Sequence, residues 1–171
     1  MRLIQNATNY DHKVFSWCQQ RRNKEVLIFF SRYLSRTADG HLYVLIGLCA
    51  LIQQQLDFLT LGVLCFLIER IIYFVIKKNV KRDRPPEAIP GFKSIIQASD
   101  QFSFPSGHTS AAFLMSTMMA IYFPWTACLF FPWAISVASS RVILGVHFPG
   151  DTVAGAVMGS SMAVLCYSML F

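Results

Sequence analysis

The chain has 171 residues, of which 54% are hydrophobic and 14% charged, and its mean hydropathy is +0.46. This length fits a single domain, residues 1–171, and a composition this apolar excludes an ordinary soluble fold and predicts an integral membrane protein. No nucleic-acid-binding motif accompanies the net charge of +6, which anionic lipid headgroups explain more simply. We therefore expect the lipid bilayer and a membrane lipid as partners, and no nucleic acid.

The N-terminal residues 1–38 predict amphipathic interfacial helices. They carry seven of the fifteen Lys and Arg residues, interleaved with aromatic and aliphatic residues. Helices of this kind lie in the headgroup layer with their basic side chains toward the phosphates. The basic side chains concerned are Arg21, Arg22, Lys24, Arg32 and Arg36. A helix packed on the rest of the protein is the alternative, and both descriptions can hold together. Asp39 is a candidate N-cap for the next helix.

The remaining residues, 39–171, predict a bundle of about five transmembrane helices. A bilayer core needs about 20 apolar residues, with a range of about 17 to 25, so the last apolar segment is a clean span while the first and fourth are short. The five segments are 41–55, 58–76, 107–123, 125–141 and 151–171. The predicted fold class is therefore all-α, an integral membrane helical bundle with an N-terminal amphipathic segment.

Two features inside these spans concern helix packing. Glu69 and Arg70 are ionisable residues at membrane depth, which are costly unless paired. Because neighbours in sequence point in different directions from a helix, each is expected to have its own partner, in a structural contact rather than in support of a site. Gly155, Gly159 and Ala163 form a ridge of small residues that permits close helix contact, within the bundle rather than in a dimer. A monomer is favoured, and the oligomeric state stays open.

Topology brings several polar residues to one membrane face. With five spans, the end of the second, the start of the third, the end of the fourth and the start of the fifth share a side, together with the long polar connection 77–105. Prolines and a glycine exclude a continuous helix in this connection, and a loop of this length in so small a protein is typically functional. The residues gathered at this face are Lys77, Arg84, Ser106, Gly107, His108, Arg141, His147 and Asp151.

This set of residues suits a phosphate dianion, because it combines three cations, a hydroxyl group and the N–H groups of a helix start. Pro149 favours the first position of a helix, so His147 should lie in the turn before it and Asp151 in its first turn, close enough to accept a ring N–H. A carboxylate in that place orients the imidazole for attack on phosphorus. His147 is therefore the predicted nucleophile, and His108 the acid that protonates the departing oxygen and then activates water.

Alternatives to this chemistry can be weighed from the same residues. Taken alone, the stretch 140–151 is equally compatible with a capped turn between two helices. A metal-dependent phosphatase would require several clustered carboxylates, whereas Asp83, Glu87 and Asp100 are dispersed. We therefore predict no metal ion and no cofactor. A non-enzymatic lipid-phosphate binder or transporter remains an alternative, although binding alone does not need two histidines.

The polar motifs resemble the three-part signature of the type 2 phosphatidic acid phosphatase (PAP2) superfamily. They are Lys77-x6-Arg84-Pro85, Pro105-Ser106-Gly107-His108 and Ser140-Arg141-x5-His147-x3-Asp151. The resemblance covers residues 77–151 and implies a metal-independent helical-bundle phosphatase with a phosphohistidine intermediate. It implies that His108 is the acid/base, His147 the nucleophile and Asp151 its partner. It also implies phosphate binding by Lys77, Arg84, Ser106, Gly107 and Arg141.

The resemblance leads to an expected substrate and location. The chain is expected to hydrolyse an isoprenyl diphosphate, phosphatidic acid or phosphatidylglycerophosphate. Many lipid-active members have six spans, and here the amphipathic segment replaces the first. Haloperoxidases that use vanadium share the signature, but they are larger soluble proteins. Basic residues are concentrated in 1–38 and in the long connection, so the positive-inside rule predicts a cytoplasmic active face. No cleavable signal peptide or targeting extension is recognised, which favours a bacterial cytoplasmic membrane.

Overall fold

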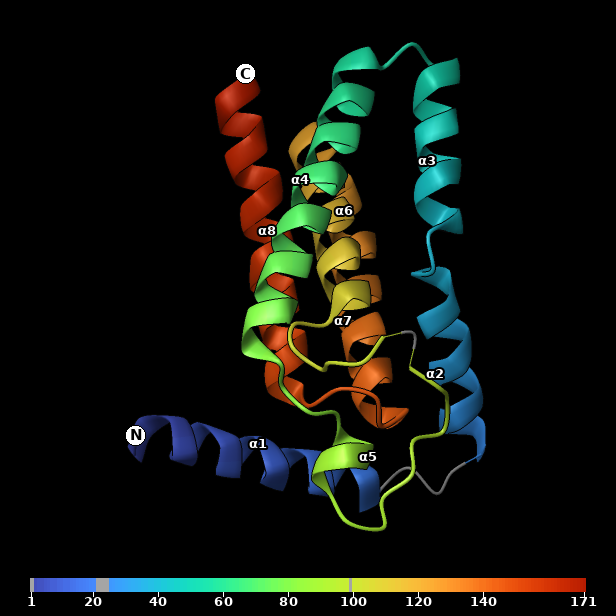
Figure 1. Cartoon of the computed structure of the whole chain (residues 1–171). Helices are drawn as coiled ribbons and strands as arrows, with labels where there is room; N and C mark the ends of the chain where they lie inside the picture. Colours follow the sequence, from blue (N-terminus) through green and yellow to red (C-terminus); the bar gives the residue numbers. More distant parts are fainter. Residues whose placement is uncertain (1, 21–24, 99) are drawn as a thin grey trace.

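The chain folds into a bundle of helices that run side by side, with one helix lying across one end (Figure 1). The computed structural model describes residues 2–20, 25–98 and 100–171, and these ranges contain helices, turns and loops but no strand. Arg21, Arg22 and Lys24, which are predicted to face lipid phosphates, lie outside the described residues. The helices are α1 (Arg2–Gln20), α2 (Glu25–Thr37), α3 (His41–Ile52), α4 (Leu56–Val80), α5 (Pro85–Ala88), α6 (Gly107–Tyr122), α7 (Ala127–Ile143) and α8 (Pro149–Leu170), with a 3-10 turn at Pro124–Thr126 before α7.

All five predicted spans are helices of the bundle. Three of them are long and apolar enough to cross a membrane, namely α4, α7 with its preceding turn, and α8. The apolar helix α3 has only 12 residues, and α6 has 16. Helix α6 lies at the centre of the bundle, where it packs against α4, α7 and α8. The all-helical membrane fold is thus confirmed, whereas the predicted number of five spans is approximate, because three to four of the described helices qualify by apolar length.

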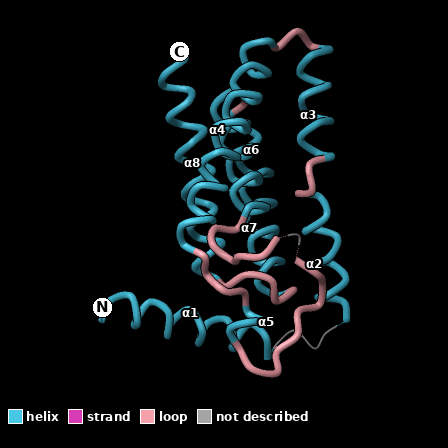
Figure 2. The backbone as a smooth tube through the Cα atoms, in the orientation of Figure 1, coloured by secondary structure: helices cyan, strands magenta, loops and turns pink. Residues whose placement is uncertain are grey.

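The N-terminal segment divides into two helices with different directions. Helix α1 lies across the end of the bundle, as expected of an interfacial helix, and it contacts α7 and α8. Its Phe15 is almost fully buried against Phe92 and Phe148. Helix α2 instead packs along α7 and leads into α3 after a short loop (Figure 2). Both helices are therefore packed on the rest of the protein, and α2 does not lie crosswise.

Two expectations about single side chains are wrong. Arg70 and Glu69 pair with each other, with Arg70 Nη2 lying 2.9 Å from Glu69 Oε2, so Arg70 has no acidic partner of its own among the described residues. The long arginine side chain turns back across the helix surface, and the fully buried glutamate also accepts a hydrogen bond from Ser110 Oγ at 2.7 Å. Asp39 does not cap α3, whose N-cap is Gly40 without a side-chain hydrogen bond.

The small residues of α8 pack directly against the backbone of α6. A Cβ atom built on Gly159 would overlap the carbonyl oxygen of Ser110 and would lie 2.9 Å from the backbone nitrogen of Leu114. Ala163 continues this contact and is fully buried. The prediction of close packing within the bundle is confirmed. This contact holds the starts of α6 and α8 next to each other.

Gly159→Ala should therefore destabilise the protein, because the added methyl group meets backbone rather than a movable side chain. Overpacking of this kind costs about 1–3 kcal/mol, so we expect a lower unfolding temperature in detergent. Gly47→Ala is the matched control, since its Cβ would lie 3.7 Å from Leu59 Cδ1, an ordinary contact. Equal unfolding temperatures for the two variants would contradict this account of the α6–α8 contact.

Candidate active site

The polar residues singled out from the sequence all lie at the end of the bundle that α1 crosses. Each lies at or near the end of a helix, where a turn or loop gives access to the others. Lys77 lies in the last turn of α4, Arg84 is the N-cap of α5, Ser106 is the N-cap of α6, Gly107 and His108 begin α6, Arg141 ends α7, His147 precedes α8, and Asp151 lies in the first turn of α8. Six of the eight are buried, and His108 and Gly107 are partly exposed.

Asp151 supports the imidazole of His147 without a direct hydrogen bond. Its Oδ2 lies 3.8 Å from His147 Nδ1, which is longer than a hydrogen bond. Ser103 Oγ lies beside both groups, 3.5 Å from Nδ1, and donates a hydrogen bond to Oδ2. The same carboxylate accepts the N–H of Phe148 at 2.8 Å and an N–H of Arg82 at 2.7 Å. Asp151 is therefore held in place by the helix start as well as by side chains.

The other ring nitrogen of His147 faces a cationic environment. Nε2 lies 3.5 Å from Arg84 Nη1, which donates to the carbonyl oxygen of Val146 at 2.6 Å. Burial lowers the pKa of His147 to about 4, and the positive charges of Arg141 and Arg84 act in the same direction, against the charge of Asp151. The imidazole is therefore neutral above about pH 4, and a neutral ring has a lone pair available for bonding to an electrophile.

Asp100, on the loop before α6, bridges two of the predicted phosphate-binding cations. Its carboxylate accepts hydrogen bonds from Lys77 Nζ and from Arg84 Nη2, and Tyr73 Oη donates to it at 2.5 Å. Burial alone would raise the pKa of Asp100, but the hydrogen bonds from Lys77 and Tyr73 and the positive charges of Lys77 and Arg84 lower it to about 2. The loop therefore folds back and brings into the site a carboxylate that the three motifs do not include.

Arg141 has a buried N–H group without a partner. Its Nη1 donates to Ser35 Oγ of α2 at 2.6 Å, whereas its Nε makes no hydrogen bond within the described part of the chain. The residue is only 3% exposed. Because an unsatisfied buried donor is costly, a bound anion that accepts this N–H would be stabilised.

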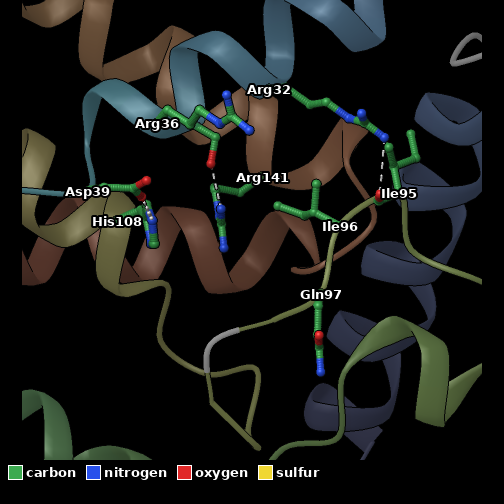
Figure 3. A pocket seen from close by; sticks show the side chains of 9 residues that line it. Arg32, Arg36, Asp39, Ile95, Ile96, Gln97, His108 and Arg141 are labelled. Atoms are coloured by element: carbon green, nitrogen blue, oxygen red, sulfur yellow. Dashed lines mark hydrogen bonds and ion pairs between the residues drawn. The ribbon is translucent and has the colours of Figure 1, made fainter.

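His108 is paired with Asp39, which the sequence analysis expected to be the N-cap of the next helix. Its Nε2 lies 2.8 Å from Asp39 Oδ1, at the junction of α2 and α3. This contact leaves Nδ1 for another partner. Two pockets meet at His108, one of about 420 Å³ beside α2 and α7 (Figure 3) and one of about 580 Å³ between α3, α4 and α6.

The start of α6 is fixed by backbone contacts. The N–H of Ser106 donates to the carbonyl oxygen of Asp151 at 3.0 Å, which ties α6 to α8. A Cβ atom on Gly107 would lie 3.0 Å from the Tyr73 ring, so glycine permits the close approach of α6 to α4. These contacts place the N-terminal end of α6 beside the cations, where its partial positive charge favours an anion.

Helix α1 reaches the site through Arg82. This arginine bridges two carboxylates, with Nη2 lying 2.5 Å from Asp11 Oδ2 and Nη1 lying 2.7 Å from Asp151 Oδ1. Asp11 also accepts the N–H of Gly150 at 2.7 Å. Sequence reasoning missed these partners, together with Ser35, Asp39, Asp100 and Ser103, because no spacing in the sequence connects them to the motifs.

Comparison with known proteins identifies relatives of this site and fold. Residues 58–171 match the family model of the PAP2 superfamily. The decaprenylphosphoryl-5-phosphoribose phosphatase of Mycobacterium tuberculosis is 32% identical over 129 residues, which cover 73% of this chain and 68% of that protein. The crystal structure of Aquifex aeolicus LpxE has a TM-score of 0.80 at 21% identity and covers 91% of this chain and 93% of its own. The PAP2 type phosphatidylglycerolphosphate phosphatase from Bacillus subtilis has a TM-score of 0.78 at 20% identity, covering 99% and 87%.

Asp100→Asn should increase the stabilisation of the protein by inorganic phosphate. In the unliganded protein the variant leaves Lys77 and Arg84 without their carboxylate, so its unfolding temperature should fall. A competing charged hydrogen bond is worth about 1.5–3 kcal/mol, so phosphate should bind roughly tenfold more tightly, and thermal unfolding at increasing phosphate concentration measures this.

Asp83→Asn is the control for this experiment, because it removes the same charge from an exposed position of the same connection. Weaker phosphate binding by Asp100→Asn than by this control would mean that Asp100 positions the two cations for the anion and does not compete with it.

Proposed function

Because the chain belongs to the PAP2 superfamily, we propose that this integral membrane phosphatase hydrolyses a lipid phosphomonoester or diphosphate through a phosphohistidine at His147. The observation that carries the proposal is the position of the buried imidazole of His147, whose Nδ1 lies 3.8 Å from Asp151 Oδ2 and whose Nε2 lies 3.5 Å from Arg84 Nη1. A nucleophile with an orienting carboxylate is not needed for binding alone. Both this arrangement and the membership of the PAP2 superfamily favour an enzyme over a non-enzymatic lipid-phosphate binder.

The first proposed step transfers the phosphoryl group to the protein. His147 Nε2 attacks phosphorus, and the bond between phosphorus and the leaving oxygen breaks as His108 gives that oxygen a proton. Cations and N–H groups around the phosphoryl oxygens stabilise the charge that spreads over them, which is the main source of catalysis in phosphoryl transfer. The groups proposed for this role are Lys77, Arg84, Arg141 and the start of α6 at Ser106 and Gly107.

The second proposed step returns the protein to its initial state. His108, now neutral, removes a proton from water as the water oxygen attacks phosphorus, and the bond to His147 Nε2 breaks. Inorganic phosphate leaves, and both histidines recover their starting protonation states. The positive charge that His147 carries as a phosphohistidine is stabilised by Asp151. The proposed reaction uses no metal ion and no cofactor.

The substrate is proposed to be a membrane lipid phosphate. The named relatives act on decaprenylphosphoryl-5-phosphoribose and phosphatidylglycerolphosphate, and for this chain we propose an isoprenyl diphosphate, phosphatidic acid or phosphatidylglycerophosphate. The pocket of about 580 Å³ next to His108 has apolar walls that include Phe66, Phe74 and Ala111. Phe74 is exposed on the outer surface of α4, so a lipid chain can reach this pocket from the bilayer.

The location is proposed from charge. Seven Lys and Arg residues lie in 1–38 and six more in 77–93, the segments before the first span and between the second and third spans, whereas the turns 53–55 and 123–126 hold none. By the positive-inside rule the site faces the cytoplasm, and we propose the inner membrane of a bacterium and a monomer.

Replacing the two histidines should have different effects on the phosphoenzyme. His147→Ala should form none and should not turn over, because the attacking atom is absent. His108→Ala should still be phosphorylated by p-nitrophenyl phosphate, whose leaving group departs unprotonated, and should then stall because no base activates water. Asp151→Asn should be intermediate. The measurement is the acid-labile label on the protein after rapid quenching with the radiolabelled ester.

The same experiment tests the remaining parts of the proposal. All reactions contain EDTA, and a loss of wild-type turnover that a divalent cation restores would contradict the metal-independent mechanism. Label on His147→Ala, or none on His108→Ala when the wild type shows a burst, would mean that the two roles are reversed or that water attacks directly.

Orientation is tested by labelling single cysteines in intact cells. In a cysteine-free background, Glu87→Cys changes an exposed residue of α5 at the site end, and Gln54→Cys changes an exposed residue of the turn before α4 at the opposite end. An impermeant reagent should label Gln54→Cys and should label Glu87→Cys only after the membrane is permeabilised. The reverse pattern would place the site on the outer face.

A further inference from the structure

The pocket of about 420 Å³ beside His108 has a strongly basic lining, with four basic side chains and one carboxylate. It lies between α2, residues 95–97 and the end of α7 (Figure 3). Four basic side chains line it, and its one carboxylate, Asp39, is paired with His108. The four are Arg32, Arg36, His108 and Arg141.

The two arginines of α2 are free to bind an anion. Arg32 donates only to a neutral group, the carbonyl oxygen of Ile95, at 3.3 Å. Within the described ranges neither Arg32 nor Arg36 forms an ion pair, and both are exposed. Their guanidinium groups present the planar pairs of N–H donors that match phosphate oxygens. At its inner wall the pocket reaches Arg141, which is proposed to bind the transferred phosphoryl group, so an anion beside Arg32 and Arg36 would be next to that group.

The place of this pocket relative to the reacting bond follows from His108. The residue that protonates the leaving oxygen lies next to that oxygen, so the leaving group occupies the space beside His108. The basic pocket and the apolar pocket of about 580 Å³ both open there. A leaving group with both a hydrocarbon chain and a negative charge would place the chain in the apolar pocket and the charge beside α2.

We propose that Arg32 and Arg36 form a second anion subsite, which binds a phosphate-type anion carried by the leaving group. This inference rests on the proposed function and narrows its substrate class. A lipid diphosphate releases a lipid monophosphate, and phosphatidylglycerophosphate releases a phosphodiester, so both leaving groups are charged. Phosphatidic acid releases a neutral diacylglycerol and gains nothing from the subsite.

The test compares two matched substrate pairs in uncharged detergent micelles. Farnesyl diphosphate and farnesyl phosphate share a chain but differ in the charge of the leaving group, and so do phosphatidylglycerophosphate and phosphatidic acid of the same acyl chains. In the double variant Arg32→Gln/Arg36→Gln, kcat/KM should fall about 10- to 100-fold for farnesyl diphosphate and phosphatidylglycerophosphate, whose leaving groups are charged. This is the loss expected for hydrogen bonds to charged groups. For farnesyl phosphate and phosphatidic acid, whose leaving groups are neutral, kcat/KM should change less than about threefold.

Controls separate this subsite from general electrostatics and from catalysis. Lys78→Gln removes a charge from an exposed position in the last turn of α4, at the end of the bundle that holds the site. This variant should change kcat/KM equally for the two substrates of a pair. Arg32→Lys/Arg36→Lys should recover part of the loss. A selective loss with only one pair identifies the source of the anion, diphosphate or phosphodiester, and supports the subsite.

Two outcomes would overturn the proposal. Equal losses on both members of each pair, or no loss on either, would contradict the subsite while leaving the phosphatase function intact, as wild-type release of phosphate from these substrates would show. Absence of wild-type turnover with all four lipids and with p-nitrophenyl phosphate would contradict the proposed function, and the subsite with it.

Discussion

Lys77, Arg84 and Arg141 bring three positive charges into a nearly closed space at one end of the bundle. Each is no more than 5% exposed, and a buried charge is tolerated only with a counter-charge or a full set of hydrogen bonds. Asp100 accepts hydrogen bonds from Lys77 and Arg84. Arg141 donates to the hydroxyl group of Ser35, and its Nε–H has no partner among the described residues. These three cations therefore share a single carboxylate partner, and the proposed phosphate substrate would supply further negative charge.

The start of α8 connects these charges to His147, the proposed nucleophile. Pro149 begins the helix, and the Asp151 carboxylate both accepts the N–H of Phe148 and lies beside the ring of His147. Asp151 thus both caps the start of α8 and lies beside the imidazole of His147. The position of its carboxylate is therefore fixed by the geometry of the helix start. Gly155 and Gly159 then allow α8 to lie directly against the backbone of α6 at Ser106 and Ser110.

The segment before the matched region 58–171 completes the site. Asp11 of α1 is bridged by Arg82 to Asp151. Ser35 holds Arg141, and Asp39 holds His108, both from the α2 end of the segment. A short, broken helix pair therefore does more than cover apolar surface, because three residues that the motifs use are supported from it. This explains why α2 runs along α7 instead of lying flat in the headgroup layer.

The sequence by itself determined the helices, the membrane class and the set of residues that meet at one face. These follow from local rules, since apolar length defines a span. Consecutive spans cross the membrane in opposite directions, so the end of one span and the start of the next lie on the same face. The tertiary structure alone decided which side chain balances which charge. Arg141 meets Ser35 across 106 positions of the chain, and Asp100 enters the site from a loop without periodicity. Such pairs depend on where a folded loop or a distant helix places its side chains, and no spacing along the chain encodes that.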